Sequence, residues 1–189
     1  LAGVYSRSKS FPLFKRLPYV EDNNNIAYKM ANSYEVVYDE LEELGFETGI
    51  LMRFNEYNKI SLKTRYVNSD IYNEKAAWNI PALKIDLEGD FRFFNKIYFQ
   101  MHGRYIGQRD SAYHPIVLNQ GSLDVTPEVR SLKGFLYLSS RLLYQVDSSW
   151  AFFLDIRSNF GSDFSKWAYY QDYNKNFLLG LRYKFDISL

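Results

Sequence analysis

Residues 82–93 alternate strictly between apolar and charged positions. One set of positions holds Leu83, Ile85, Leu87, Gly89, Phe91 and Phe93, and the other holds Lys84, Asp86, Glu88, Asp90 and Arg92. Successive side chains of a β-strand point to opposite faces, whereas a helix repeats about every 3.6 residues. The alternation therefore predicts a strand that separates an apolar face from an entirely ionic one.

The same alternation recurs along the chain and, with a first strand near residues 2–12, predicts eight strands. The other seven are expected at residues 46–54, 60–67, 82–93, 97–105, 134–144, 150–160 and 177–187.

The predicted connections alternate in length. Hairpin turns are expected at residues 55–59, 94–96 and 145–149, and long loops at 13–33, 68–81, 107–133 and 161–175. Outer-membrane barrels have short turns at one end, longer loops at the other and strands of about 9–11 residues. The sequence thus predicts an all-β fold, a transmembrane antiparallel up-and-down β-barrel of about eight strands.

Aromatic residues make up 19% of the chain, and many lie near predicted strand ends. Aromatic rings gather at both interfaces of a membrane, which supports the transmembrane interpretation. Soluble barrels and sandwiches show the same alternation with the apolar face turned inward. The period alone leaves open which face meets which solvent.

In the transmembrane interpretation the charged strand faces line the lumen. The residues predicted to face it are Lys63, Arg65, Lys84, Asp86, Glu88, Asp90, Arg92, Gln100, His102, Arg104, Asp155, Arg157, Arg182 and Lys184. We expect the row Asp86, Glu88 and Asp90 to form ion pairs across strands, because structural ion-pair networks are the common role of such rows.

Residues 134–185 resemble the C-terminal end of TonB-dependent receptor barrels, in the form seen in Bacteroidota. The matching pieces are Leu136-Tyr137-Leu138, the segment from Trp150 to Phe160, Trp167-Ala168-Tyr169-Tyr170-Gln171-Asp172-Tyr173 and the segment from Asn176 to Phe185. Upstream, residues 72–81 and 103–109 also fit this group. The family usually ends at the aromatic residue of its last strand, whereas four residues follow Phe185 here.

The resemblance implies an outer-membrane uptake receptor. Residues 1–189 would form the C-terminal segment of a larger barrel, without the family's plug domain, although a complete eight-stranded barrel stays open. The implied partners are outer-membrane lipid, a plug domain, a TonB-type energising protein and other outer-membrane subunits. The alternative function is a structural or assembly subunit of a secretion or uptake complex.

Little in the sequence indicates covalent chemistry. The formal net charge is +1, which argues against nucleic acid as a partner, and Cys is absent. His114 with Ser111 and Asp110 leaves a weak possibility of a hydrolase. Asp39, Glu40, Glu42 and Glu43 could bind Ca²⁺ in a loop, but they lack the spacing of a calcium loop. We expect no enzyme activity, no cofactor and no metal.

The remaining candidates are aromatic residues of the long loops. Loops on a rigid scaffold often bind ligands, although anchoring at the membrane interface is the commoner role of such rings. The extracellular-loop binding candidates are Trp78, Tyr113, Trp167, Tyr169, Tyr170 and Tyr173.

Overall fold

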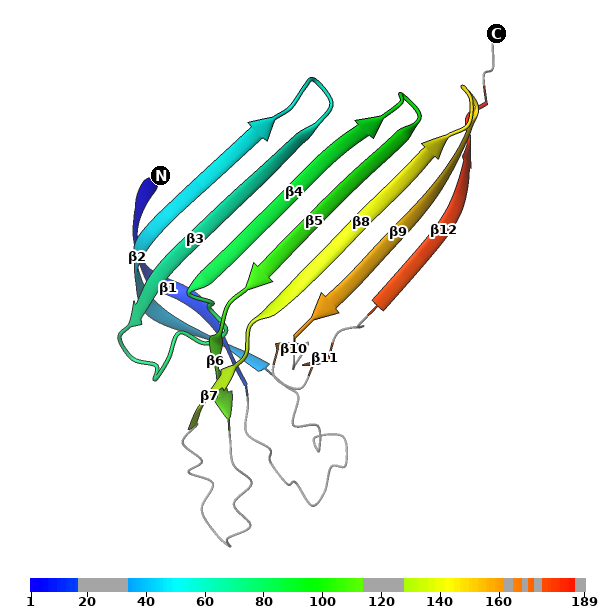
Figure 1. The fold of residues 1–189 in the computed structure, drawn as a ribbon. Coiled ribbons are helices and arrows are strands. Elements are labelled where there is room, and N and C mark those ends of the chain that lie inside the picture. The colour runs from blue at the N-terminus through cyan, green and yellow to red at the C-terminus, as the bar shows by residue number, and fades with distance from the viewer. Residues whose placement is uncertain (17–33, 114–127, 162–164, 168–169, 172–174, 186–189) are drawn as a thin grey trace, which may run out of the picture.

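The computed structural model describes residues 1–16, 34–113, 128–161, 165–167, 170–171 and 175–185. Its main feature is one antiparallel sheet of eight strands (Figure 1). In order of pairing, the strands are β1 (Ala2–Arg16), β2 (Tyr34–Arg53), β3 (Lys59–Ile71), β4 (Leu83–Phe93), β5 (Ile97–Ile106), β8 (Phe135–Gln145), β9 (Trp150–Phe160) and β12 (Lys175–Tyr183). None of the described residues forms a helix long and apolar enough to cross a bilayer.

The strands pair in the order in which they occur, so the predicted all-β, up-and-down arrangement is confirmed. The predicted bounds hold closely for β4, β5, β8 and β9. They fail for β2, which begins at Tyr34 rather than near residue 46. Charged and apolar residues do not alternate over 34–45, so the period gave no signal there.

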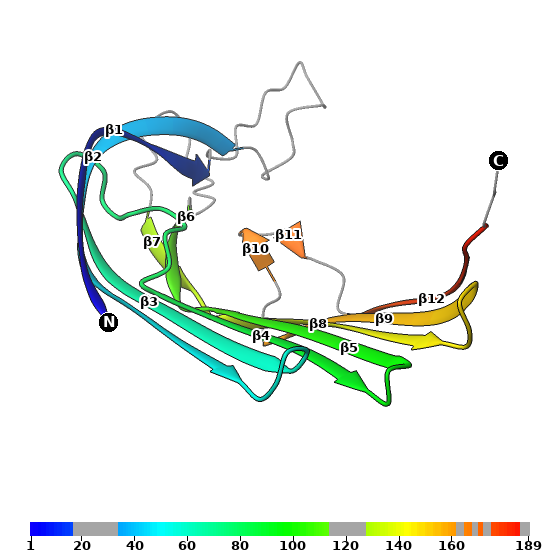
Figure 2. The ribbon, with the colours of Figure 1, turned by 90° about the horizontal axis from the view of Figure 1, so that it is seen from above.

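The described sheet does not close on itself, because β1 and β12 each pair with only one neighbour. Figure 2 shows the sheet from above as a curved, open wall, with β1 and β2 curling round at one side. The alternative of a barrel completed by these eight strands alone is therefore not what the structure shows.

Two long connections contain small hairpins that the alternation did not predict. The first pairs β6 (Arg109–Tyr113) with β7 (Glu128–Leu132), and the second pairs β10 (Ser165–Trp167) with β11 (Tyr170–Gln171). Figure 2 places β6, β7, β10 and β11 on the concave side of the wall.

The small hydrophobic core also lies on the concave side, at the end of the sheet that carries the long connections. Its buried members are Leu13 of β1, Trp78 of the β3–β4 connection and Ala112 of β6. Leu13 pairs with Val37 on β2. Alternate residues of a strand share a face, so Glu43 and Glu47 lie on the same face of β2 as Val37. The strand face that carries the charged residues is therefore the concave one.

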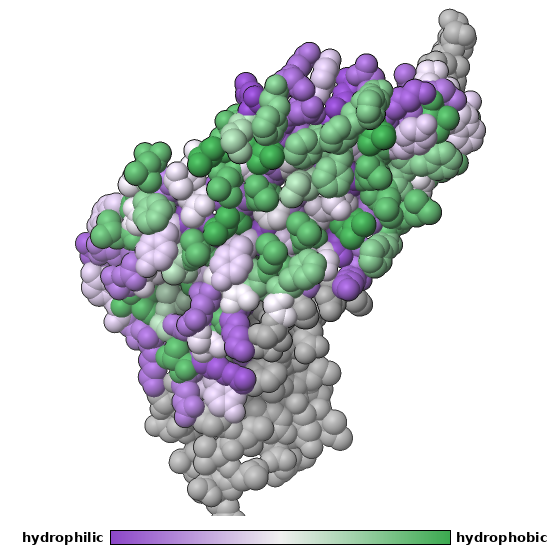
Figure 3. All heavy atoms as spheres, viewed as in Figure 1, coloured by the Kyte–Doolittle hydropathy of each residue, from purple (hydrophilic) through white to green (hydrophobic). Residues whose placement is uncertain are grey.

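The convex face carries large apolar side chains that no other described part of the chain covers. They include Phe46, Ile50, Met52, Leu142, Phe152, Phe177, Leu179 and Leu181, with the Tyr66 ring among them. In Figure 3 this face is green over much of the strands, with paler side chains in between. This distribution reverses the usual arrangement of a soluble sheet, in which the apolar face is the covered one.

The short turns are fixed by their own side chains and backbone. Asn55 Oδ1 accepts hydrogen bonds from the backbone N–H groups of Tyr57 and Asn58, at 2.9 and 2.8 Å. Phe94 and Asn95 have φ values of 51° and 56°, as a type I′ turn requires. These turns confirm the predicted hairpins.

Candidate functional site

Those residues predicted to face a lumen that lie within strands are all on one side of the sheet, the concave side. The register aligns them in rows: Lys63 pairs with Asp86, which pairs with Arg104. Lys184 follows the last residue of β12, where its backbone N–H donates to the Ser149 carbonyl at 2.9 Å. We call this surface the polar face.

Of the acidic row predicted to form ion pairs across strands, Asp86 and Asp90 do so, whereas Glu88 makes only a 3.5 Å contact with Ser61 in the described part of the chain. Arg104 Nε lies 2.5 Å from Asp86 Oδ1, and His102 Nε2 lies 3.3 Å from the same oxygen. Lys59 Nζ lies 3.2 Å from Asp90 Oδ2. Because most of these groups are partly exposed, each pair contributes about 1 kcal/mol or less to stability.

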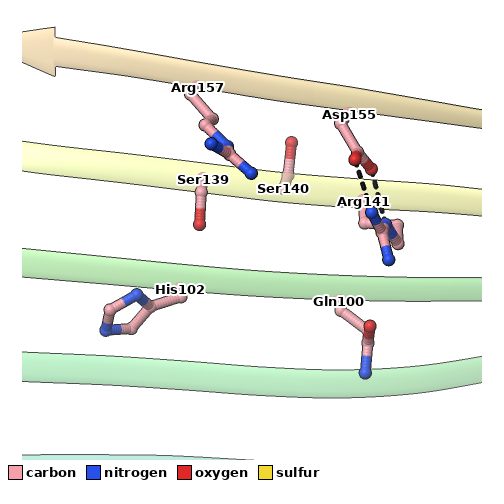
Figure 4. Close-up of a pocket in the computed structure, with 7 residues that line it drawn as sticks. All are labelled: Gln100, His102, Ser139, Ser140, Arg141, Asp155 and Arg157. Carbon is pink, nitrogen blue, oxygen red and sulfur yellow. Dashed lines mark hydrogen bonds and ion pairs between the residues drawn. The ribbon is translucent and has the colours of Figure 1, made fainter. Parts of the chain in front are cut away.

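The best-formed pair joins β8 to β9. Arg141 Nε and one terminal nitrogen lie 2.6 and 2.5 Å from the two oxygens of Asp155 (Figure 4). This two-bond geometry is the strongest arrangement available to a guanidinium and a carboxylate. The pair borders a hollow of about 340 Å³ that is also lined by Gln100, His102, Ser139, Ser140 and Arg157.

Replacing Asp155 with asparagine is expected to lower the free energy of unfolding by about 1–2 kcal/mol, because two charge-assisted hydrogen bonds weaken while Arg141 stays half exposed. Urea unfolding followed by circular dichroism measures this change. Glu88→Gln is the matched control, because Glu88 lies on the same face with only a 3.5 Å contact to Ser61. Equal effects of both variants would contradict the importance of the forked geometry.

Trp78 is not an exposed loop ring, so that candidate is corrected. The side chain is 1% exposed and packs with Leu13 and Ala112. Its indole N–H donates to Glu74 Oε2 at 2.9 Å, while Lys15 Nζ lies 3.0 Å from Glu74 Oε1. A large ring whose N–H is satisfied inside the fold serves packing rather than ligand capture.

The other aromatic candidates stay predictions. Tyr113 lies in β6, where the Arg130 guanidinium is 5.5 Å from its ring centroid. Trp167 and Tyr170 pair across the β10–β11 hairpin. Tyr169, Tyr173 and His114 lie outside the described residues.

The acidic residues considered for Ca²⁺ lie on a strand rather than in a loop. Asp39 and Glu43 share the polar face of β2, and Glu40 and Glu42 lie on its other face. No group of metal-binding side chains occurs among the residues that the structure describes.

Asp39 instead fixes the backbone of the β3–β4 connection. Its carboxylate, 2% exposed, accepts from the N–H groups of Asn73 and Glu74 at 2.9 and 2.7 Å. It also accepts from the Asn73 side chain and the Glu40 N–H, both at 2.7 Å. Burial alone would raise the pKa of Asp39, but these donors together hold it below its ordinary value.

Sequence reasoning did not select Arg141, and it considered Asp39 only as a possible Ca²⁺ ligand. Arg141 lies in the noisiest alternating segment, where Phe135 and Tyr137 occupy the same face as the charge. The alternation of side chains along the strand could have placed Arg141 on the same face as Asp155. The role of Asp39 in holding the β3–β4 connection has no local signal, because Asn73 and Glu74 lie 34 and 35 residues away.

No family model, curated protein or solved structure matches the chain.

Proposed function

We propose that the chain forms part of the wall of an outer-membrane β-barrel of the TonB-dependent receptor type, which takes up a polar solute. One observation carries the proposal: the convex face is apolar and exposed while the concave face is ionic. Lipid in place of water on the convex side would account for this distribution.

The strand lengths fit this role. A strand of 11 residues, such as β4, extends about 36 Å at about 3.3 Å per residue, or about 25 Å when tilted by about 45°. This matches the height of about 25 Å of the apolar band of such barrels.

Exposed rings at the short-turn end fit an interface belt. Tyr183 contacts Trp150 in a tilted arrangement and Phe185 edge to face, each with ring centroids 4.5 Å apart, and Phe94 lies at the tip of the β4–β5 turn. Rings in this position suit the membrane–water boundary, where an apolar body meets water.

The open edges of the sheet favour a larger barrel. Unpaired backbone groups of a strand within the hydrocarbon cost several kcal/mol each, so β1 and β12 need further strands beside them. The polar face would then hold a plug domain or line a solute path. A structural subunit of an outer-membrane complex would have the same wall, and uptake that depends on a TonB-type protein distinguishes the two.

Adjacent leucines of β12 test the membrane role. Leu179 is 76% exposed on the convex face, and Leu178 is 57% exposed on the concave face, where it pairs with Asp155. Since the chain has no cysteine, Leu179→Cys and Leu178→Cys can each carry one fluorescent label in the full chain reconstituted in vesicles.

We expect a nitroxide on the lipid tails to quench the label at position 179 at least threefold more than the label at 178. Aqueous iodide should show the opposite preference. Equal iodide quenching at both positions, or a chain that stays in solution without detergent, would contradict the proposal and favour a soluble sheet.

A further inference from the structure

A second hollow on the polar face has an excess of cations. It has a volume of about 420 Å³, lies near the short turns and adjoins the hollow beside His102, with which it shares Gln100 and Arg141. Its lining comes from the β2–β3 turn and from strands β4, β5, β8 and β12, and comprises Tyr57, Asp90, Phe91, Arg92, Tyr98, Phe99, Gln100, Arg141, Leu143, Gln145 and Arg182.

Arg92 is held in this hollow by two rings. Its guanidinium carbon lies 4.5 Å from the ring centroid of Tyr57 and 5.1 Å from that of Tyr98. Stacking on aromatic faces fixes the plane of a guanidinium without using its N–H donors. The backbone N–H of Arg92 donates to Asn58 Oδ1 at 2.6 Å, which fixes the strand beneath it.

The donors of Arg92 are unused within the described part of the chain. Its buried Nε has no hydrogen-bond partner there, and the side chain makes no ion pair. A buried N–H without an acceptor costs about 1–3 kcal/mol, so such an atom marks a place where an acceptor fits.

Two more guanidinium groups border the hollow. Arg141 lines it while its fork binds Asp155, and Arg182 approaches from β12. In the register, Ala151 of β9 lies between Arg182 of β12 and Gln145 of β8.

The single carboxylate of the lining does not neutralise these cations. Asp90 Oδ1 accepts from Gln100 Nε2 at 3.0 Å, and Asp90 Oδ2 lies 3.2 Å from Lys59 Nζ. With one anion against Arg92, Arg141 and Arg182, the lining has a formal charge of +2.

We propose that this hollow binds a small solute through a carboxylate or phosphate group, with Arg92 as the principal ligand. Two oxygens of a carboxylate or a phosphate can accept two parallel hydrogen bonds from a guanidinium, and the rings of Tyr57 and Tyr98 hold the Arg92 guanidinium in one orientation. The role of the hollow as a solute site rests on the proposed uptake function. The hollow adds the class of solute, a small molecule with a carboxylate or phosphate group.

Calorimetry on the folded full chain in nonionic detergent at low salt tests the proposal, with citrate and inorganic phosphate as separate probes. We expect one or both to bind. Arg92→Gln should weaken that binding at least tenfold, and Arg182→Gln should weaken it several-fold. Lys63→Gln is the control, because it removes one exposed positive charge from the same face outside the hollow.

Binding of citrate alone assigns a carboxylate ligand, and binding of phosphate alone assigns a phosphate ligand. Binding of neither probe overturns the inference, and so does an equal loss in Arg92→Gln and Lys63→Gln. If Arg92→Gln fails to fold, the comparison of binding by Arg182→Gln and Lys63→Gln tests the inference. The calorimetric titration does not depend on the quenching experiment, so failure of anion binding can be told apart from failure of the membrane role.

Discussion

Replacing Asp39 with asparagine is expected to destabilise the loop end of the sheet by about 2–4 kcal/mol, because a buried carboxylate loses its charge opposite several donors. The new amide would also direct its own N–H groups at backbone N–H groups. Faster amide hydrogen exchange at Asn73 and Glu74 measures the local effect, and urea unfolding measures the global one.

Asp70→Asn is the matched control, because Asp70 lies at the same end of the sheet with only 3.5 Å contacts to Asn68. We expect less than about 0.5 kcal/mol from it, as for an ordinary surface position. Similar exchange rates in the two variants would contradict the role assigned to Asp39.

The same carboxylate gives this region a pH dependence. The folded pKa of Asp39 lies below its ordinary value of 3.8, so its contribution is complete above that value. It is lost as the pH falls through the lower, folded pKa. In the Asp39→Asn variant, exchange at Asn73 corrected for its intrinsic rate should lose this acid-dependent component.

Replacing Gly45 with alanine is expected to cost about 3 kcal/mol or more, because the added methyl group has no room. Its Cβ would overlap the Tyr66 carbonyl oxygen and lie 2.7 Å from Val67 Cα. Both atoms belong to the backbone of β3, so only separation of β2 from β3 relieves the overlap. A lower urea midpoint, with loss of folded protein on extraction, is the measurement.

Gly49→Ala is a control on the same face of the same strand. There the nearest atoms to a Cβ are the Leu62 carbonyl oxygen at 3.8 Å and Lys63 Cγ at 4.0 Å. We expect a change within about 0.5 kcal/mol, since alanine also restricts the unfolded chain. A tolerated Gly45→Ala would show that β2 and β3 do not approach so closely.

Sequence reasoning was strongest where side chains alternate over short distances. Strand β9 was predicted at its observed bounds, and the β4–β5 turn at Phe94 and Asn95 was placed correctly. The rows of charged residues on the polar face could be predicted from the alternation of side chains, once neighbouring strands were paired in sequence order. These features depend on the pleat of the strand and on turn geometry, which a short window of sequence determines.

The alternation of apolar and charged residues could not show which way the sheet curves. It also could not show which segments lie on the concave side. Trp78 is a loop residue by every local criterion, yet Leu13 and Ala112, from distant segments, cover it. The excess of cations near Arg92 was also hidden, because it needs residues from five separate elements in one place. Tertiary packing rather than periodicity determines such environments.

The pairing of strands in sequence order favours assembly of the sheet from hairpins. Three pairs, β2–β3, β4–β5 and β8–β9, are joined by turns of a few residues, so closing them costs the least chain entropy. Asn58, at the tip of the first pair, already presents an acceptor to Arg92 in the second. The sheet can therefore grow by docking preformed hairpins side by side, and their shared end is the one that carries the guanidinium cluster.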